Sequence, residues 1–231
     1  MLDSKSVSIM HFSDVLCVWA YLTQIRMDTL KDKFGDQVNL NYHFIQVFGS
    51  VESKMEQNWN HRGGIKAYSK LVFDEASKFD HIEVHEDIWL KNTPTSSASC
   101  HLFLKAIQLV EKNGDLPLGD DRSSIVESIV WAMREDFFKN LVNISALPAQ
   151  IELAERLNLP VDKILAEISS GAAFAALDRD TQLKEKFRVM GSPTLVFNEG
   201  RQMIYGNVGY RVIEANVLEL LNKPKAAASW C

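Results

Sequence analysis

The sequence of 231 residues predicts an α/β fold in which an all-helical subdomain interrupts a sheet-containing domain. Three observations lead to this prediction. Strand-like runs lie near both ends of the chain, at residues 7–12 and 194–197. Between them, roughly 120 residues carry apolar side chains at helical spacing. A turn of three residues then separates two short strands near the C-terminus, which is typical of a hairpin. The predicted order is β-α-β, a helical insertion, and β-β-α.

The first unit begins with an apolar strand at residues 7–12. A helix follows, because apolar side chains recur at near-helical spacing until Gly35. These side chains are Trp19, Leu22, Ile25, Leu30 and Phe34. Residues 38–47 alternate between apolar and polar side chains, which predicts a second, half-buried strand. Residues 50–62 are polar, and we expect an irregular segment there.

Helical stripes then follow one another up to residue 188. Pro148 opens a short helix and Pro160 ends it, because proline fits the first helical turn and not the interior. The main stripes are Leu102, Phe103, Ala106, Ile107 and Val110; Val126, Ile129, Val130, Met133 and Phe137; and Phe174, Leu177, Leu183 and Phe187. We therefore expect residues 63–188 to form the helical insertion.

The chain returns to the sheet after this insertion. The strands at residues 194–197 and 202–205 form the expected hairpin. A last helix carries Ile213, Val217, Leu220 and Leu221 and ends before Pro224. Residues 1–62 and 189–231 are thus predicted to be the two parts of one domain.

Composition limits the classes of function. The net charge of −5 is spread along the chain, so a nucleic acid or an anionic membrane is not an expected partner. The N-terminus lacks the pattern of a secretory signal, and no apolar run is long enough to span a membrane. The three cysteines, at positions 17, 100 and 231, are too few for a disulfide framework. These features predict a cytoplasmic protein.

Cys17 lies where a strand ends and a helix begins. The helix dipole and unpaired N–H groups at such a position favour the thiolate, so we expect a lowered pKa and a nucleophilic side chain. The alternative is that Cys17 is a small buried apolar residue, as free cysteines often are.

Gly191-Ser192-Pro193-Thr194 forms the second candidate segment. Proline cannot donate a hydrogen bond, so Pro193 belongs at the start of the strand that follows. A cis bond before Pro193 would leave the N–H and C=O groups of Ser192 free to pair with an extended peptide. The alternative is an ordinary trans proline that opens a strand.

Residues 12–21 read Phe-Ser-Asp-Val-Leu-Cys-Val-Trp-Ala-Tyr. This segment resembles the Cys-Pro-Trp-Cys-Tyr stretch of DsbA-family oxidoreductases, with Val18 in place of the proline and Ala20 in place of the second cysteine. Parts of residues 92–106 and 134–145 are similar to the cytosolic two-domain subfamily. The resemblance extends over residues 8–221 and implies a thioredoxin fold with an inserted helical subdomain.

The resemblance also implies functional roles. Cys17 would be the nucleophile and Trp19 a wall of its pocket. Ser192, Pro193, Thr194 and Asn207 would hold the substrate or a thiol such as glutathione. The segment at 206–211 departs from the acid-and-arginine pattern of glutathione-binding relatives, because Val208 stands at the position of the acid. Since position 20 is alanine, an external thiol would have to release a mixed disulfide from Cys17.

Three functions are consistent with these features. The leading interpretation is a thiol-disulfide oxidoreductase that acts on a small thiol or disulfide or on a protein disulfide, with glutathione as the external thiol. The alternatives are a glutathione-dependent isomerase or transferase, of the hydroxychromene carboxylate isomerase or kappa-class type, and a non-catalytic binding module. The sequence does not predict the oligomeric state.

Further cysteines and histidines need an interpretation. We hypothesise that Cys231 supplies the resolving thiol, against the alternative of a tail without a role. Cys100 is interpreted as a packing residue, and His101 as a surface residue. His81, Glu83 and His85 alternate with apolar residues, which indicates a solvated face, so no metal is expected.

Overall fold

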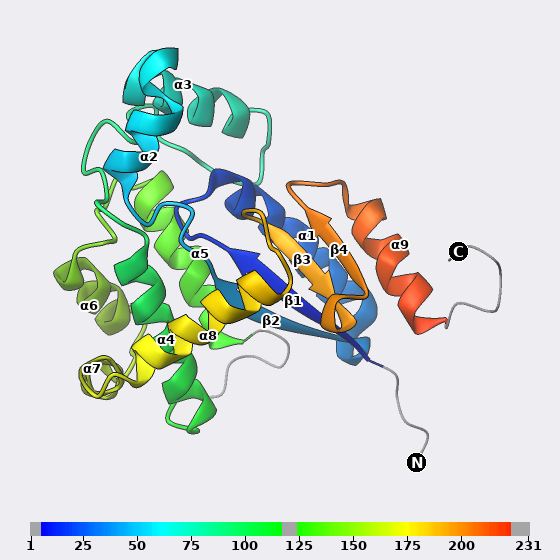
Figure 1. The fold of residues 1–231 in the computed structure, drawn as a ribbon. Helices are drawn as coiled ribbons and strands as arrows, with labels where there is room; N and C mark the ends of the chain where they lie inside the picture. Colours follow the sequence, from blue (N-terminus) through cyan, green and yellow to red (C-terminus); the bar gives the residue numbers. More distant parts are fainter. Residues whose placement is uncertain (1–5, 117–123, 223–231) are drawn as a thin grey trace.

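A computed structural model describes residues 6–116 and 124–222, and a four-stranded sheet forms its centre (Figure 1). The strand order is β2-β1-β3-β4. β1 pairs with β2 in parallel and with β3 antiparallel, and β3 forms an antiparallel hairpin with β4. The strands are β1 (Val7–Ser13), β2 (Val38–Phe44), β3 (Thr194–Phe197) and β4 (Gln202–Tyr205). The predicted strands and hairpin are confirmed, although β2 ends three residues earlier than expected.

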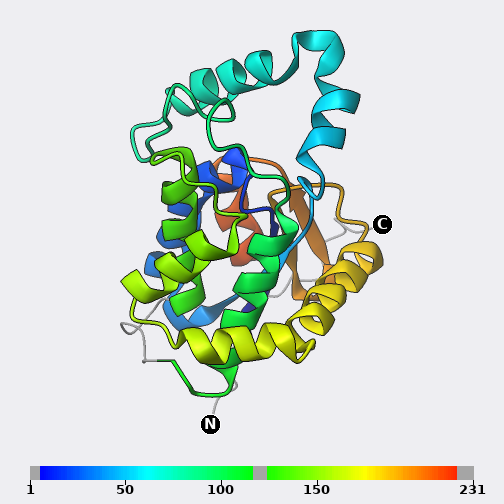
Figure 2. The same ribbon diagram turned by 90° about the vertical axis from the view of Figure 1, so that its left-hand side faces the viewer.

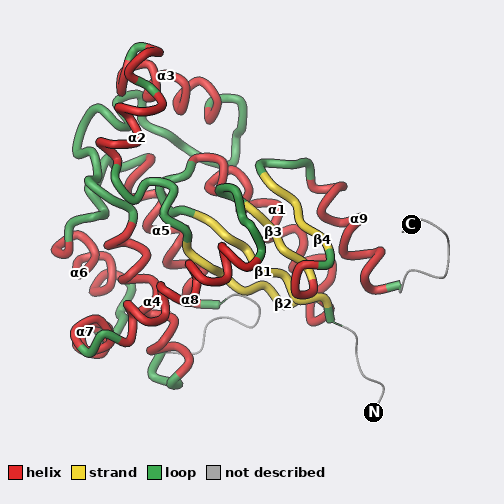
Figure 3. Tube along the Cα trace, in the orientation of Figure 1, coloured by secondary structure: helices red, strands yellow, loops and turns green. Residues whose placement is uncertain are grey.

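Helices cover both faces of the sheet (Figure 3). On one face, α1 (Val18–Phe34) and α9 (Tyr210–Leu221) pack together. On the other face, α8 (Ala172–Lys186) turns Leu183 toward the sheet. Burial of these apolar faces holds the three layers together. The fold is therefore a mixed α/β arrangement with the start of α1 at one end of the sheet.

The remaining helices lie between β2 and β3 in the sequence. They are α2 (Val51–Asn58), α3 (Gly64–Ala76), α4 (Ala98–Lys112), α5 (Ile125–Phe138), α6 (Leu147–Arg156) and α7 (Val161–Ser169). Figure 2 shows α2 and α3 as an arch above the end of the sheet where β1 leads into α1. The predicted domain boundaries at residues 62 and 188 stay a prediction. No helix in the described parts of the chain has the length and apolar character needed to cross a bilayer.

The expectation of an irregular segment at residues 50–62 is wrong. α2 occupies most of it, followed by a short 3₁₀ turn at Asn60–Arg62. The side chain of Ser50 caps α2 by accepting a hydrogen bond from Ser53 N at 3.2 Å. Only Val51 and Met55, one turn apart, are buried from this helix, so its apolar pattern is too short to reveal it.

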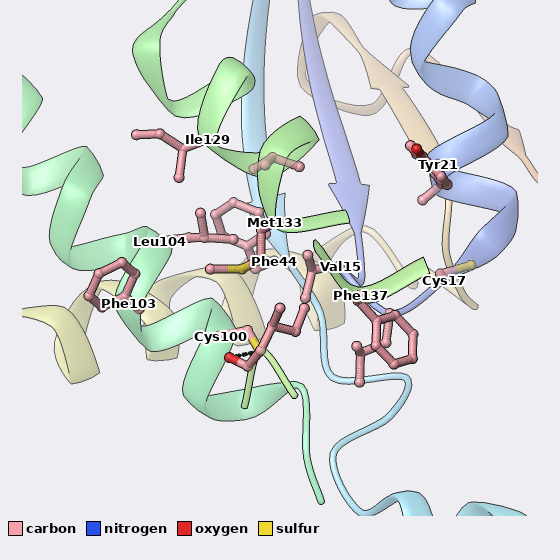
Figure 4. Close-up of a cluster of buried hydrophobic side chains, with 14 of the residues drawn as sticks. Val15, Cys17, Tyr21, Phe44, Cys100, Phe103, Leu104, Ile129, Met133 and Phe137 are labelled. Carbon is pink, nitrogen blue, oxygen red and sulfur yellow. Dashed lines mark hydrogen bonds between the residues drawn. The ribbon is translucent and has the colours of Figure 1, made fainter. Parts of the chain in front are cut away.

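One large apolar cluster joins the start of α1 to the helical part of the chain (Figure 4). Tyr21 of α1 stacks on Phe138 of α5 with ring centroids 5.2 Å apart and contacts Trp131 at 4.9 Å. Val15 and Phe137 lie in the same cluster and are fully buried or nearly so. The turn that carries Cys17 is therefore fixed from two sides, by the sheet and by the helices.

Candidate functional site

Cys17 is the N-cap residue of α1 and has an extended backbone. Its carbonyl oxygen accepts hydrogen bonds from Ala20 N and Tyr21 N, both at 3.1 Å, and its own N–H donates to Asp14 O at 3.1 Å. Its thiol donates to the carbonyl oxygen of Ser192 at 3.3 Å. The structure thus brings together two residues that lie 175 positions apart in the sequence.

The Ser192–Pro193 bond is cis, so this prediction is confirmed. The prediction that the C=O group of Ser192 is free is wrong, because that oxygen accepts the Cys17 thiol. The Ser192 hydroxyl accepts a hydrogen bond from Asp14 N at 2.9 Å. Thr194 is buried, and its hydroxyl donates to Gly191 O at 2.6 Å. Ser192 therefore binds the Cys17 turn with two different groups, whereas Thr194 fixes its own loop.

The structure raises the pKa of Cys17 above its ordinary value, so the expectation of a lowered pKa is wrong for this conformation. Burial is the largest cause, since only 5% of the residue is exposed, and the negative charge of Asp14 acts in the same direction. Hydrogen bonds from Ser192 and from the backbone at Ala20 oppose the increase without cancelling it. At neutral pH the side chain is accordingly a thiol that donates to Ser192.

Asp14 is a fully buried carboxylate at the centre of this turn. Its Oδ1 accepts from Leu16 N at 2.9 Å, and its Oδ2 accepts from Phe48 N at 2.8 Å and from Ser97 Oγ at 2.7 Å. His101 Nε2 lies 3.5 Å from Oδ1. Burial would raise the pKa of Asp14, but His101 and the N–H donors outweigh it and hold the pKa below its usual value. Asp14 therefore ties the Cys17 turn to the loop before α2 and to the start of α4.

The interpretation of His101 as a surface residue is wrong. Its side chain is fully buried, stacks on Phe44 with centroids 5.4 Å apart, and accepts a hydrogen bond from Val15 N at 3.1 Å. Neither His101 nor Asp14 was expected in the site. Asp14 lies within residues 12–21 and His101 within residues 92–106, so the sequence places each in a segment that resembles the family. That the two side chains meet depends on the fold.

Two cations interact with the charge of the Cys17 thiolate, and they differ in how deeply they are buried. Arg134 of α5 is fully buried, and its Nη2 donates to Ser13 Oγ at 3.4 Å. Lys54 of α2 is half-buried, and its ammonium lies 4.5 Å from the ring centroid of Phe48. Burial lowers the pKa of both residues, and the negative charge of a Cys17 thiolate opposes this. Both positive charges therefore favour the thiolate once it forms.

Aromatic side chains pack around Phe48 and around Tyr68 of α3. Phe48 stacks on Trp89 at 5.0 Å, and Tyr68 contacts Trp59 at 4.9 Å and Phe48 at 6.2 Å. The pKa of Tyr68 is raised well above its usual range by burial and by the charge of Cys17. Trp19, the predicted pocket wall, is half-buried and lies on α1 two residues after Cys17.

A separate cleft of about 630 Å³ lies beside α2. Cys17 is not among the residues that line it. Its lining residues are Ser50, Val51, Glu52, Met55, Glu56, Asn60, Gly64, Ile65, Thr93, Pro94 and Thr95. The two exposed glutamates make this cleft acidic, which distinguishes it from the surroundings of Lys54.

The side chain of Asn207 is hydrogen-bonded to α1. Its carboxamide oxygen accepts hydrogen bonds from Thr23 Oγ1 at 3.2 Å and from Arg26 Nη1. Arg211 is exposed. Arg26 is therefore the basic residue that lies beside Asn207. Arg26 belongs to a different element from Asn207, so the sequence around Asn207 does not indicate it.

The other cysteines differ from Cys17. Cys100 is fully buried, donates to Ile144 O at 3.2 Å, and has its pKa raised to about 12 by burial. In Figure 4 it lies apart from Cys17, across the apolar cluster. Cys231 lies outside the described residues, so the hypothesis of a resolving thiol there is not examined by the structure. Within residues 6–116 and 124–222, no group of three or more potential ligands could hold a metal ion.

Comparison with known proteins gives one family and several similar folds. The model of the DSBA-like thioredoxin domain matches residues 8–217. A probable DsbA oxidoreductase from Streptomyces coelicolor is similar in structure, with a TM-score of 0.70, 13% identity, and coverage of 97% of this chain and 94% of that one. The cytosolic disulfide reductase DsbM from Pseudomonas aeruginosa, solved with GSH, has a TM-score of 0.63, 14% identity, and coverage of 92% and 99%.

A 2-hydroxychromene-2-carboxylate isomerase is also similar, with a TM-score of 0.60, 15% identity, and coverage of 92% of this chain and 95% of that one. No curated protein shows significant sequence similarity to the chain. At these identities the structural matches establish the fold. They include both disulfide oxidoreductases and an isomerase, so the fold is compatible with more than one reaction.

Proposed function

Since the chain belongs to the DSBA-like thioredoxin domain family, we propose that it is a thiol-disulfide oxidoreductase that works through the single nucleophile Cys17. The observation that carries this proposal is the 3.3 Å contact between the Cys17 thiol and Ser192 O, at the N-terminus of α1. A substrate sulfur that bonds to Cys17 would lie beside the backbone of Ser192. Disulfide oxidoreductases among the similar structures support the assignment.

The first chemical step follows from the chemistry of the thiolate. Cys17 loses its proton, and the thiolate attacks one sulfur of a disulfide R–S–S–R. A Cys17–S–S–R bond forms, the R–S–S–R bond breaks, and RS⁻ leaves with the electron pair. The disulfide is thereby the oxidant, and Cys17 is oxidised. The hydroxyl of Ser192 and the charges of Arg134 and Lys54 stabilise the thiolate before the attack.

The second step needs a thiol from outside the described residues. Ala20 stands where the resemblance places the second cysteine, and it is fully buried. Cys100 is buried with a pKa of about 12, so it supplies almost no thiolate near neutral pH. We propose glutathione as this thiol. Its thiolate would attack the R sulfur of the mixed disulfide, form a new disulfide with R, and release Cys17. The GSH in the similar DsbM structure supports this choice.

One observation favours the second candidate, a glutathione-dependent isomerase or transferase. Burial keeps Cys17 protonated at neutral pH. A protonated Cys17 could donate a hydrogen bond to the thiolate of a bound glutathione, which would then be the reactive group. The similar isomerase structure supports this reading at the level of the fold. A cytoplasmic location, supported by the cytosolic DsbM neighbour, is part of both proposals.

Oxidised glutathione separates the two candidates. The oxidoreductase proposal expects a glutathione adduct on Cys17 by mass spectrometry, its loss in Cys17→Ser, and its removal by reduced glutathione. Cys100→Ser is the matched control and should keep the adduct. No adduct on Cys17, together with turnover of a small electrophile by reduced glutathione, would establish the second candidate instead. The absence of both the adduct and the turnover would indicate a binding module.

A further inference from the structure

Lys54 has an unusual environment for a surface lysine. It is half-buried, and its ammonium lies over the Phe48 ring at 4.5 Å from the centroid. Phe48 in turn donates its N–H to the carboxylate of Asp14, three residues before Cys17. The ammonium of Lys54 is therefore held close to the Cys17 turn, near enough for Asp14 and Cys17 to act on its charge.

No carboxylate among the described residues lies within ion-pair distance of Lys54. The lysines of several other helices are paired, such as Lys70 with Asp74 at 2.8 Å and Lys31 with Glu127 at 2.6 Å. Asp14 does not fill this role, because its two oxygens are fully buried and already accept three hydrogen bonds, with His101 Nε2 3.5 Å from Oδ1. The contact of Lys54 with an aromatic face leaves its N–H donors available to an anion.

The helical periodicity of α2 places Lys54 on a different face from the acidic residues of the same helix. Glu52 and Glu56 are each two residues away, which is roughly 200° of rotation around a helix. Both line the 630 Å³ cleft, and Lys54 does not. Arg134 is the other cation near Cys17, but it is fully buried. Of these two cations among the described residues, Lys54 is the one that is only half-buried, so it is the one that a substrate can reach.

We propose that Lys54 determines the substrate specificity of Cys17 by selecting disulfides that carry a carboxylate. This proposal rests on the proposed function and names the substrate class of the same site. The ammonium binds the carboxylate while the thiolate of Cys17 attacks the disulfide. Cys17–S–S–R forms, the original S–S bond breaks, and the second half leaves as RS⁻. The chain carries a net charge of −5, so a preference for an anion has to come from a local positive charge.

Two small aromatic disulfides test the proposal. Dithiobis(nitrobenzoate) carries a carboxylate on each ring, and dithiodipyridine is uncharged at neutral pH. Rates of adduct formation on Cys17 are measured with both disulfides, in a Cys231→Ser chain so that the thiol at position 231 does not compete with Cys17. Lys54→Gln should lower the ratio of the anionic to the neutral rate by about fivefold, the effect expected of one nearby charge in a water-rich setting. The ratio removes any general change in thiolate reactivity, which affects both disulfides alike.

Three further variants sharpen the result. Lys54→Arg should keep the ratio, and Lys54→Glu should lower it further. Lys70→Gln, on the neighbouring helix α3, changes the net charge equally and should leave the ratio unchanged. An unchanged ratio in Lys54→Gln, with both disulfides still reacting at Cys17, would overturn the role of Lys54 and leave the oxidoreductase function standing. Failure of both disulfides to react with Cys17 would overturn the function and the Lys54 proposal together.

Discussion

The thiol of Cys17 donates a 3.3 Å hydrogen bond to the carbonyl oxygen of Ser192, which belongs to the loop before β3. The same loop returns a second contact, since the Ser192 hydroxyl accepts from Asp14 N at 2.9 Å. Two segments from opposite ends of the chain therefore hold one another in place. The thiol is also shielded from water, and this shielding determines how its reactivity depends on pH.

We expect the alkylation of Cys17 by iodoacetamide to rise with pH through a midpoint above the ordinary thiol value. Burial raises the pKa, so the thiolate, which is the reactive form, appears only at higher pH. Mass spectrometry of the Cys17 peptide across a pH series measures the midpoint. Cys17→Ser should abolish this signal, and a midpoint below that of a free thiol would contradict the prediction.

Ser192→Ala should slow the alkylation of Cys17 at a given pH and destabilise the fold. The hydroxyl is one of the groups that lower the pKa of Cys17, so its loss raises that pKa further. Asp14 N–H also loses its acceptor inside the protein, which costs about 1–3 kcal/mol. Urea unfolding and the alkylation rate measure both effects. Thr194→Val is the matched control, because it removes a hydroxyl of the same loop that bonds Gly191 O, and it should leave the alkylation rate unchanged.

Asp14→Ala should destabilise the fold and lower the pKa of the Cys17 thiol. The change leaves the N–H groups of Leu16 and Phe48 without their acceptor, which predicts a loss of about 3 kcal/mol. The same change removes a negative charge that raises the pKa of Cys17, so the alkylation midpoint should move to lower pH. Ser97→Ala removes one donor to the carboxylate and keeps the charge. It should cost less stability and move the midpoint little.

Periodicity predicts most of the fold because its strands and long helices have clear apolar faces. β1, the hairpin and α4 follow directly from their patterns. α2 is missed because it buries only Val51 and Met55. Its remaining signal is the serine cap at position 50, which polar composition alone does not distinguish from a loop.

The site is predicted less completely, for an electrostatic reason. The position of Cys17 at a helix start is readable from the sequence, and so is the proline loop opposite. The buried charge around the thiol is not, because Asp14 meets His101 and Phe48 only after folding. Local sequence supports the helix-dipole argument for a lowered pKa. Burial, which reverses that argument, is a property of the whole structure.

His11 of β1 should make stability depend on pH in the acidic range. The residue is fully buried, and neither ring nitrogen has a hydrogen-bond partner among the described residues. Burial, together with the charge of Arg134, lowers its pKa from 6.5 to about 3. The unfolded chain therefore binds a proton at His11 between these values and the folded chain does not. The contribution of His11 to the free energy of unfolding is fully present above pH 6.5. It is lost as the pH decreases toward 3, by at most about 5 kcal/mol.

His11→Phe keeps an aromatic ring at this position, which lies 5.2 Å from the ring of Tyr42, and cannot take up the proton. We expect its free energy of unfolding to vary less between pH 4 and 6.5 than that of the natural chain. Asp14 and Asp180 have pKa values below the usual range for a carboxyl, so their contributions are lost at still lower pH and do not obscure this window. His61→Gln replaces an exposed histidine and serves as the control. Urea unfolding at several pH values gives the slopes, and equal slopes for the natural chain and His11→Phe would show that His11 takes up its proton in the folded state as well.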